Sequence, residues 1–204
     1  LPVVVIIGLT VWNFFNKTVM VSVKIVNTFR GIVSKIYIPK YMLILEKLYV
    51  NAFKMAISFG IVAAFAAVYR ISPTVNLLWC LPVVFLMLLL TFACSVLAAH
   101  FGVYVNDLYN VVQVILRFMF YLSGVFYDVS DRLSQTTFLG LNVGRMMITV
   151  NPVAYVIDEL RKIIIYGQPL RMEIYLYWLV ISTTLVFAGL KLMYRFENSY
   201  VKVV

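Results

Sequence analysis

The chain has 204 residues, of which 64% are hydrophobic and only 12% are charged. Soluble proteins carry roughly 25% charged residues, so this composition indicates an integral membrane protein. Its net charge of +9 does not point to nucleic acid, because basic residues in a membrane protein first mark the cytoplasmic side. We therefore expect membrane lipids around the chain and no nucleic-acid partner.

Several kinds of chemistry are excluded by missing motifs. Cys80 and Cys94 fall in one apolar stretch, where 14 residues of helix would separate them by about 21 Å, and a disulfide needs Cα atoms within about 7 Å. With one histidine, no metal site can be recognised. There is no G-x-x-x-x-G-K-[ST] loop, so the chain cannot hydrolyse ATP by that route. H-E-x-x-H, G-x-S-x-G and C-x-x-C are also absent, which removes the common membrane hydrolases and redox proteins.

Apolar runs long enough to cross a bilayer recur along the chain, since a spanning helix needs about 20 mostly apolar residues. The first run is already under way at Leu1, without an initiating methionine, so we expect an N-terminally truncated fragment. The predicted fold is an all-α integral membrane protein, a polytopic helix bundle in one transmembrane domain over residues 1–204. Five spans are predicted, at residues 1–16, 48–69, 71–99, 104–127 and 174–190.

A strongly basic connection follows the first span. Residues 17–54 contain seven lysines and arginines against one glutamate, so the positive-inside rule predicts a cytoplasmic connection over residues 17–47. Within it, Gly31 and Pro39 bracket the eight residues GIVSKIYI, which is enough for about two helical turns. Two interpretations stay open: a basic surface that rests on anionic lipid headgroups, or a helix that docks on a cytoplasmic partner.

The segment 104–127 is an apolar helix with an arginine at its centre. A charge in the middle of a span is costly, so Arg117 normally faces a bundle interior or a wet cavity and marks a functional site by default. Helical spacing puts Gln113, Arg117 and Tyr121 on one face. Either Arg117 only pairs with a group on another helix, or this stripe lines a pore where it meets anionic cargo. The aromatic residues expected to line or shape the same pore are Phe118, Phe120, Phe126 and Tyr127.

A polar elbow, Asn106 and Asp107, precedes this helix. The loop around it has no lysine or arginine, so only the alternation of spans places it in the cytoplasm. An alternative function is an integral membrane enzyme that acts on lipid-linked substrates, with Asp107, His100 or Asp158 as acid or base. A general base needs a positioned partner, and the sequence has no clustered carboxylates or nucleophile motif to supply one.

Residues 128–173 are too rich in charge and proline to span the membrane. They nevertheless contain two uncharged stretches of 12 residues, at 133–144 and 146–157. Apolar segments of 10–14 residues are typical of re-entrant or interfacial helices. We therefore expect two short helices of this kind between the last two spans, in an extracytoplasmic region.

One helix in this region has clear end signals. Asn151 predicts the N-cap, Pro152 the first helical position and Gly167 the C-terminal stop. Four charged residues lie together in its middle, so we expect that part to face water or lipid headgroups. They are Asp158, Glu159, Arg161 and Lys162.

Five stretches occur in a characteristic order: GLTVWNFF, GIVSKIYIPKYML, VNDLYNVVQVILRFMFYLSGVFY, NPVAYVIDELRK and RFENSYVKVV. Together they cover nearly the whole chain. They resemble the membrane subunit of polysaccharide-exporting ABC transporters, the type-2 permeases that export lipid-linked O-antigens and teichoic acids. The chain departs from that pattern at Asn106-Asp107, where the family commonly has Arg-Asp, and at Ser123-Gly124, where proline often follows the serine.

The resemblance implies six spans in the full chain, with one span and an amphipathic helix upstream of Leu1. It implies a homodimeric pore in the bacterial cytoplasmic (inner) membrane and two copies of a P-loop ATPase subunit. ATP and Mg²⁺ would be bound by that partner, so this chain would carry no cofactor and would not be an enzyme. The two short helices would cap the pore outside. The residues implied in ATPase docking are Gly31, Ile32, Val33, Ser34, Lys35, Ile36, Tyr37, Ile38 and Pro39.

The function expected from this resemblance is the permease subunit of an ATP-driven ABC exporter. Its substrate would be a lipid-linked polysaccharide, such as O-antigen, teichoic acid or a similar cell-surface glycan, moved outward across the membrane. Three alternatives stay open: an exporter of drugs or small lipids with the same fold, the membrane enzyme considered above, and a purely structural scaffold.

Overall fold

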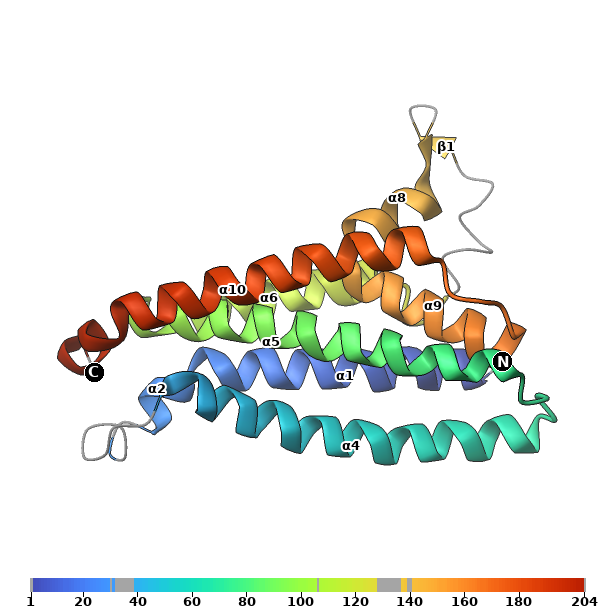
Figure 1. The fold of residues 1–204 in the computed structure, drawn as a ribbon, viewed down its shortest axis with the longest axis horizontal. Coiled ribbons are helices and arrows are strands. Elements are labelled where there is room, and N and C mark those ends of the chain that lie inside the picture. The colour runs from blue at the N-terminus through green and yellow to red at the C-terminus, as the bar shows by residue number, and fades with distance from the viewer. Residues whose placement is uncertain are drawn as a thin grey trace.

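The computed structural model describes residues 2–29, 31, 39–105, 107–127, 137–138 and 141–203. Over these residues the chain is a bundle of long helices (Figure 1). Four helical stretches are long and apolar enough to cross a membrane, which confirms the predicted all-α, multi-pass membrane bundle. They belong to α1 (Pro2–Val23), α4 (Lys40–Val68), α5 (Cys80–Tyr104) with the short 3-10 helix η1 (Val75–Trp79) before it, and α10 (Met172–Val203).

The remaining elements are short. The predicted span at 104–127 corresponds to α6 (Leu108–Leu122), whose 15 residues measure about 23 Å, less than the roughly 30 Å of bilayer hydrocarbon. An apolar helix is therefore present there, but the count of five spans is not confirmed. The others are α2 (Ile25–Thr28), α8 (Val143–Val150), α9 (Pro152–Tyr166) and an antiparallel pair of two-residue strands, β1 (Thr137–Phe138) and β2 (Leu141–Asn142).

The long helices lie side by side, with α5 at the centre. α5 packs along α10 on one side and along α1 on the other, and α4 covers the far side of α1 (Figure 1). α6 contacts α1 and α5, while α9 packs against α1, α5 and α8. The main apolar core forms where α1, α5 and α9 meet, and a smaller cluster around Ile25, Val96 and Met193 joins α2, α5 and α10.

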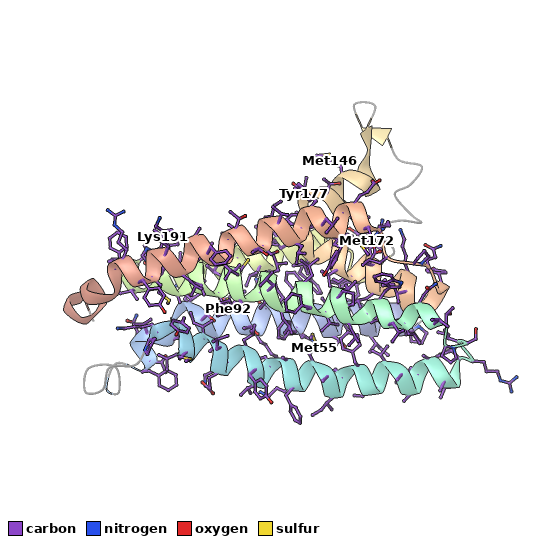
Figure 2. All side chains as sticks on the ribbon, viewed as in Figure 1. Met55, Phe92, Met146, Met172, Tyr177 and Lys191 are labelled. Atoms are coloured by element: carbon purple, nitrogen blue, oxygen red, sulfur yellow. The ribbon has the colours of Figure 1, made fainter. Side chains whose placement is uncertain are left out.

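The long helices give the bundle two ends (Figure 1). The end that holds α2, the start of α4 and the C-terminal part of α10 is called the basic end here. The opposite end, which holds α9, the turn after α4 and the start of α10, is called the α9 end. Figure 2 labels Lys191 toward the basic end and Met172 at the α9 end. The exposed or helix-end cations of the basic end include Lys24, Lys40, Lys47, Lys191 and Arg195.

The helices extend further than the hydropathy pattern predicted. α1 continues past residue 16 to Val23, and α4 begins at Lys40 instead of residue 48. Within the predicted connection over residues 17–47, the described residues 17–23, 25–28 and 40–47 are helical. Pro39 is the N-cap of α4. Residues 32–38 of the predicted docking segment lie outside the described part of the chain.

At the basic end, the elbow between α5 and α6 lies against the end of α1. A Cβ on Gly102 of α5 would lie 1.9 Å from the carbonyl oxygen of Val23, so glycine is needed for this approach. Lys24 places its Nζ 4.0 Å from the ring centroid of Tyr109 in α6. The elbow and the basic connection therefore share one end of the bundle, as the alternation of spans predicted.

Gly102→Ala is expected to lower the melting temperature of the detergent-solubilised protein. The added methyl group meets backbone, which cannot rotate away, and overpacking of this kind costs about 1–3 kcal/mol. The matched control is Gly60→Ala in α4, where no atom lies within 4 Å of a Cβ and alanine is the better helix former. Equal melting temperatures for the two variants would show that α1 and α5 do not meet at Gly102.

Candidate functional site

The predicted stripe on α6 is exposed in the single chain. Gln113, Arg117 and Tyr121 all lie on the outer surface of the helix, and Leu116 is the one buried residue between Leu108 and Leu122. No described residue forms a hydrogen bond or ion pair with the Arg117 side chain. The interpretation in which Arg117 only pairs with another helix of the same chain therefore finds no support in the described residues.

The aromatic residues at the end of α6 gather around Phe120. Its ring centroid lies 5.4 Å from that of Trp12 in α1, 5.5 Å from Tyr121 and 5.3 Å from Phe126. Tyr127 donates its hydroxyl to the carbonyl oxygen of Tyr121 at 3.1 Å. These residues form the α6 aromatic cluster. Phe118, also predicted for the pore, is exposed on the surface of α6.

The backbone that follows α6 is held by a buried arginine from α9. The guanidinium of Arg161 donates to the carbonyl oxygens of Gly124 at 2.7 Å, Val125 at 2.6 Å and Tyr127 at 2.8 Å. Its Nε donates to the carbonyl oxygen of Val4 in α1 at 3.0 Å. Because guanidinium is a planar fork with five donors, one side chain joins α1, α6 and α9. The carbonyls of Gly124, Val125 and Tyr127 follow the last residue of α6, where no helical partner is available to them.

Small residues make room for this anchor. A Cβ on Gly8 of α1 would lie 2.6 Å from Nη2 of Arg161 and 2.7 Å from the carbonyl oxygen of Val125. Gly124 adopts a left-handed conformation with φ of 62°, which glycine allows without strain. The predicted N-cap residue also links α9 to the end of α6. Asn151 accepts hydrogen bonds from the amides of Val153 and Ala154 and donates to the Ser123 hydroxyl at 2.9 Å.

The two carboxylates of α9 are buried in an ion-pair network. Glu159 accepts from the backbone N and the Nε of Arg171, both at 2.7 Å. Asp158 lies 2.6 Å from Nη2 of Arg171 and 3.2 Å from Nζ of Lys162. Burial lowers the pKa of Arg171, but the hydrogen bond and charge of Glu159 outweigh this and hold the pKa above its ordinary value. The network contains two anions and two cations, so it is internally neutral.

The prediction that the charged middle of α9 faces water or lipid headgroups is therefore wrong for three of its four charged residues. Asp158, Glu159 and Arg161 are each at most 1% exposed. The reason is tertiary: their partners Val4, Gly124 and Arg171 are distant in sequence, and they satisfy charges that a lone helix would have to expose. The helix bounds themselves were predicted correctly, since Asn151 caps α9 and Gly167 ends it in the left-handed conformation.

The other candidate groups do not assemble into a reactive centre. Asp107 is exposed at the start of α6, and Asn106 lies outside the described residues. His100 is buried at the basic end against the rings of Phe101 and Phe196, whereas Asp158 lies at the α9 end. The described residues contain no group of histidine, cysteine and carboxylate side chains that could hold a metal ion.

Comparison with known proteins identifies a relative. No family model matches the chain. The chain is similar to an O-antigen export system permease protein, RfbA, of Klebsiella pneumoniae, with 24% identity over 198 residues, which cover 95% of this chain and 73% of that protein. The resemblance to polysaccharide-exporting type-2 ABC permeases that the motifs indicate is therefore confirmed by a relative that matches almost the whole chain.

Proposed function

We propose that this chain is the membrane subunit of an ATP-driven exporter that moves a lipid-linked polysaccharide outward across the bacterial cytoplasmic membrane. In this proposal two copies form the export path, and two copies of a separate P-loop ATPase hydrolyse ATP. The observation that carries the proposal is the exposed face of α6. Gln113 and Arg117 lie on this face, and the α6 aromatic cluster follows them toward the end of the helix. The similarity to an O-antigen export permease supports the cargo class.

The polar face of α6 that holds Gln113 and Arg117 needs a second protein surface opposite it. Polar and charged groups at membrane depth are placed toward a bundle interior or a wet cavity, yet Arg117 and Gln113 lie on the outside of the single chain. A second copy that brings its own α6 opposite would turn both stripes inward. The guanidinium then suits the phosphate linkage of a lipid-linked glycan, and the aromatic rings suit the faces of its sugars.

The distribution of charge supports the orientation. At the α9 end, Arg70 is exposed, Arg161 donates to backbone carbonyls, and Lys162 and Arg171 are paired with carboxylates. At the basic end, Lys191 and Arg195 on α10 are exposed. The positive-inside rule therefore favours a cytoplasmic basic end. Gly31 and Pro39, which flank the proposed ATPase-docking segment, would then lie on the side where an ATPase can reach them.

The position of α9 supports a re-entrant region on the opposite side. Ten of its 15 residues are buried, and they pack against α1 and α5, two of the helices long enough to span. A helix that is buried on nearly all sides belongs to the core of a bundle. In the proposal, α8 and α9 close the extracytoplasmic end of the export path, and the cap residues Asn151 and Pro152 fix where α9 begins.

The proposal is tested by co-purification. The full-length protein, expressed with its gene neighbourhood and extracted in mild detergent, is weighed by native mass spectrometry. We expect a complex of two copies of this chain with two copies of a P-loop ATPase. A monomer without an ATPase would refute the proposed assembly. Drug resistance on overexpression, with unchanged surface glycan, would assign the cargo to the small-molecule alternative instead.

Arg117→Gln is expected to reduce surface glycan in cells by about tenfold, because a hydrogen bond to a charged group contributes about 1.5–3 kcal/mol and 1.4 kcal/mol is a factor of ten. Arg117→Lys keeps the charge at the same place and is expected to retain more export. Both variants change an exposed side chain, so protein amount and melting temperature should stay at the parental level. Parental export by Arg117→Gln would remove Arg117 from the path.

A further inference from the structure

A second polar surface lies between α1 and α4, away from α6. It is a groove of about 190 Å³. Met55, labelled in Figure 2, is buried between the two helices and lies among its lining residues. The polar residues that line the groove are Thr10, Asn13 and Lys17 from α1, and Asn51, Lys54 and Ser58 from α4.

Helical spacing explains why these residues meet. Asn13 and Lys17 are four residues apart, and Asn51, Lys54 and Ser58 follow at steps of three and four, so each set occupies one face of its helix. The two faces are joined by a hydrogen bond from the Asn51 amide to the Thr18 hydroxyl at 3.1 Å. Hydrogen bonds of this kind between spanning helices are expected to hold the helices together. They account for Asn51 and Thr18, but not for the two lysines or for Asn13.

The lysines lie well inside the two helices. Lys17 is 15 residues from Pro2, and Lys54 is 14 residues from Val68, which places them roughly 21–23 Å from the α9 end of each helix. The hydrocarbon core is about 30 Å thick. Long lysine side chains within a span extend their ammonium groups toward the nearer headgroup layer. For Lys17, six residues from Val23, this is the layer at the basic end, whereas Lys54 lies midway along α4, 14 residues from both Lys40 and Val68.

The groove is electropositive. Its lining includes two ammonium groups and two carboxamides, and no carboxylate is among the residues that line it. Glu46, the one acidic residue of α4, instead forms an ion pair with its neighbour Lys47 at 2.9 Å. Two cations that share one groove repel each other when it is empty, and an anion between them removes that repulsion.

We propose that this groove binds a phosphate group, with Lys17 and Lys54 as its cationic ligands and Asn13 as a neutral donor. The phosphate belongs either to an anionic lipid of the leaflet at the basic end or to a free phosphate ion. The site is separate from the α6 face, because α6 packs on α1 and α5 whereas the groove lies between α1 and α4. It therefore does not depend on the proposed export path.

The test measures lipid binding by the purified full-length protein in detergent. Native mass spectrometry with added phosphatidylglycerol or phosphatidylcholine is compared for the parent and for Lys17→Gln/Lys54→Gln. We expect the parent to retain phosphatidylglycerol in preference to phosphatidylcholine, and the double variant to retain about tenfold less phosphatidylglycerol. The control, Lys47→Gln/Lys191→Gln, removes two cations outside the groove and should bind phosphatidylglycerol like the parent.

Competition with inorganic phosphate separates the two sources. If millimolar phosphate displaces phosphatidylglycerol from the parent, the groove takes the free ion; if it does not, the groove takes a lipid headgroup. Asn13→Ala leaves the Asn51–Thr18 bond intact and gives a second measurement should the double variant fail to fold, with about twofold weaker retention expected. Equal retention of the two lipids by the parent, or parental binding by both groove variants, would overturn the proposal.

Discussion

Replacing Arg161 by methionine is expected to remove most folded protein from the membrane extract. The side chain is 1% exposed and donates to four backbone carbonyls. Each buried acceptor that loses its partner costs about 1–3 kcal/mol. The Val4 carbonyl lies within α1 and keeps its helical partner, so the three losses at Gly124, Val125 and Tyr127 cost about 3–9 kcal/mol, which is comparable with the 5–15 kcal/mol that holds a typical domain together. Size-exclusion chromatography of the solubilised variant measures the result as loss of the monodisperse peak.

Two further variants distinguish the effect of the positive charge of Arg161 from the effect of its planar guanidinium. Arg161→Lys keeps the cation, but a single ammonium group cannot reach Val4 and the turn at 124–127 together as the planar fork does; we expect a folded fraction between those of the methionine variant and the parent. Arg195→Met removes an exposed arginine from α10 and should leave the elution profile unchanged. A methionine variant of residue 161 that elutes and melts like the parent would show that the anchor does not hold the bundle.

The anchor also ties the candidate export path to the rest of the fold. The carbonyl of Tyr127 is bound by a residue 34 positions later in the chain, and the ring of Phe126 meets Phe120 in the α6 aromatic cluster. The backbone that carries these two aromatic residues is therefore held by α9, while their side chains contact α6. A change in the position of α9 would move the end of the proposed path directly, since Arg161 and Asn151 connect the two helices.

The features that could be predicted from sequence are those that depend on neighbouring residues. Continuous apolar runs predicted the helices that became α1, α4, α5 and α10, because crossing a bilayer requires about 20 apolar residues in succession. The ends of α9 were predicted for the same reason: an Asn-Pro start and a glycine stop act within one helical turn.

The burial of charge on α9 could not be predicted this way. Asp158, Glu159 and Arg161 have the composition of a solvated helix face, and only partners from α1, the end of α6 and residue 171 make their burial possible. One signal was available: apolar residues surround these charges on every side of the helix, which is typical of a buried helix. For α6 the sequence predicted the correct polar stripe, whereas it did not predict that the helix ends at Leu122 and that Arg161 binds the carbonyls that follow.

Arg171→Gln is the second change with a large expected effect. It leaves Asp158 and Glu159, which are at most 1% exposed, without the guanidinium that both share. Breaking a buried ion pair by removing one partner costs about 3–5 kcal/mol, because the remaining charge stays buried. We expect a fall in melting temperature that is much larger than for Lys47→Gln, which breaks the exposed pair with Glu46 and should cost about 0–1 kcal/mol.

A double-mutant cycle shows whether this loss comes from the pair itself. Glu159→Gln removes one carboxylate and leaves Arg171 bound to Asp158, so we expect it to cost less than Arg171→Gln. In Glu159→Gln/Arg171→Gln the two side chains can hydrogen-bond as neutral groups, and the double variant should melt higher than the sum of the single losses predicts. Contacting charged residues show coupling of about 0.5–3 kcal/mol in such cycles. Simple additivity would mean that Arg171 stabilises α9 through Asp158 or through packing on the Tyr155 ring, 5.7 Å away, and not through Glu159.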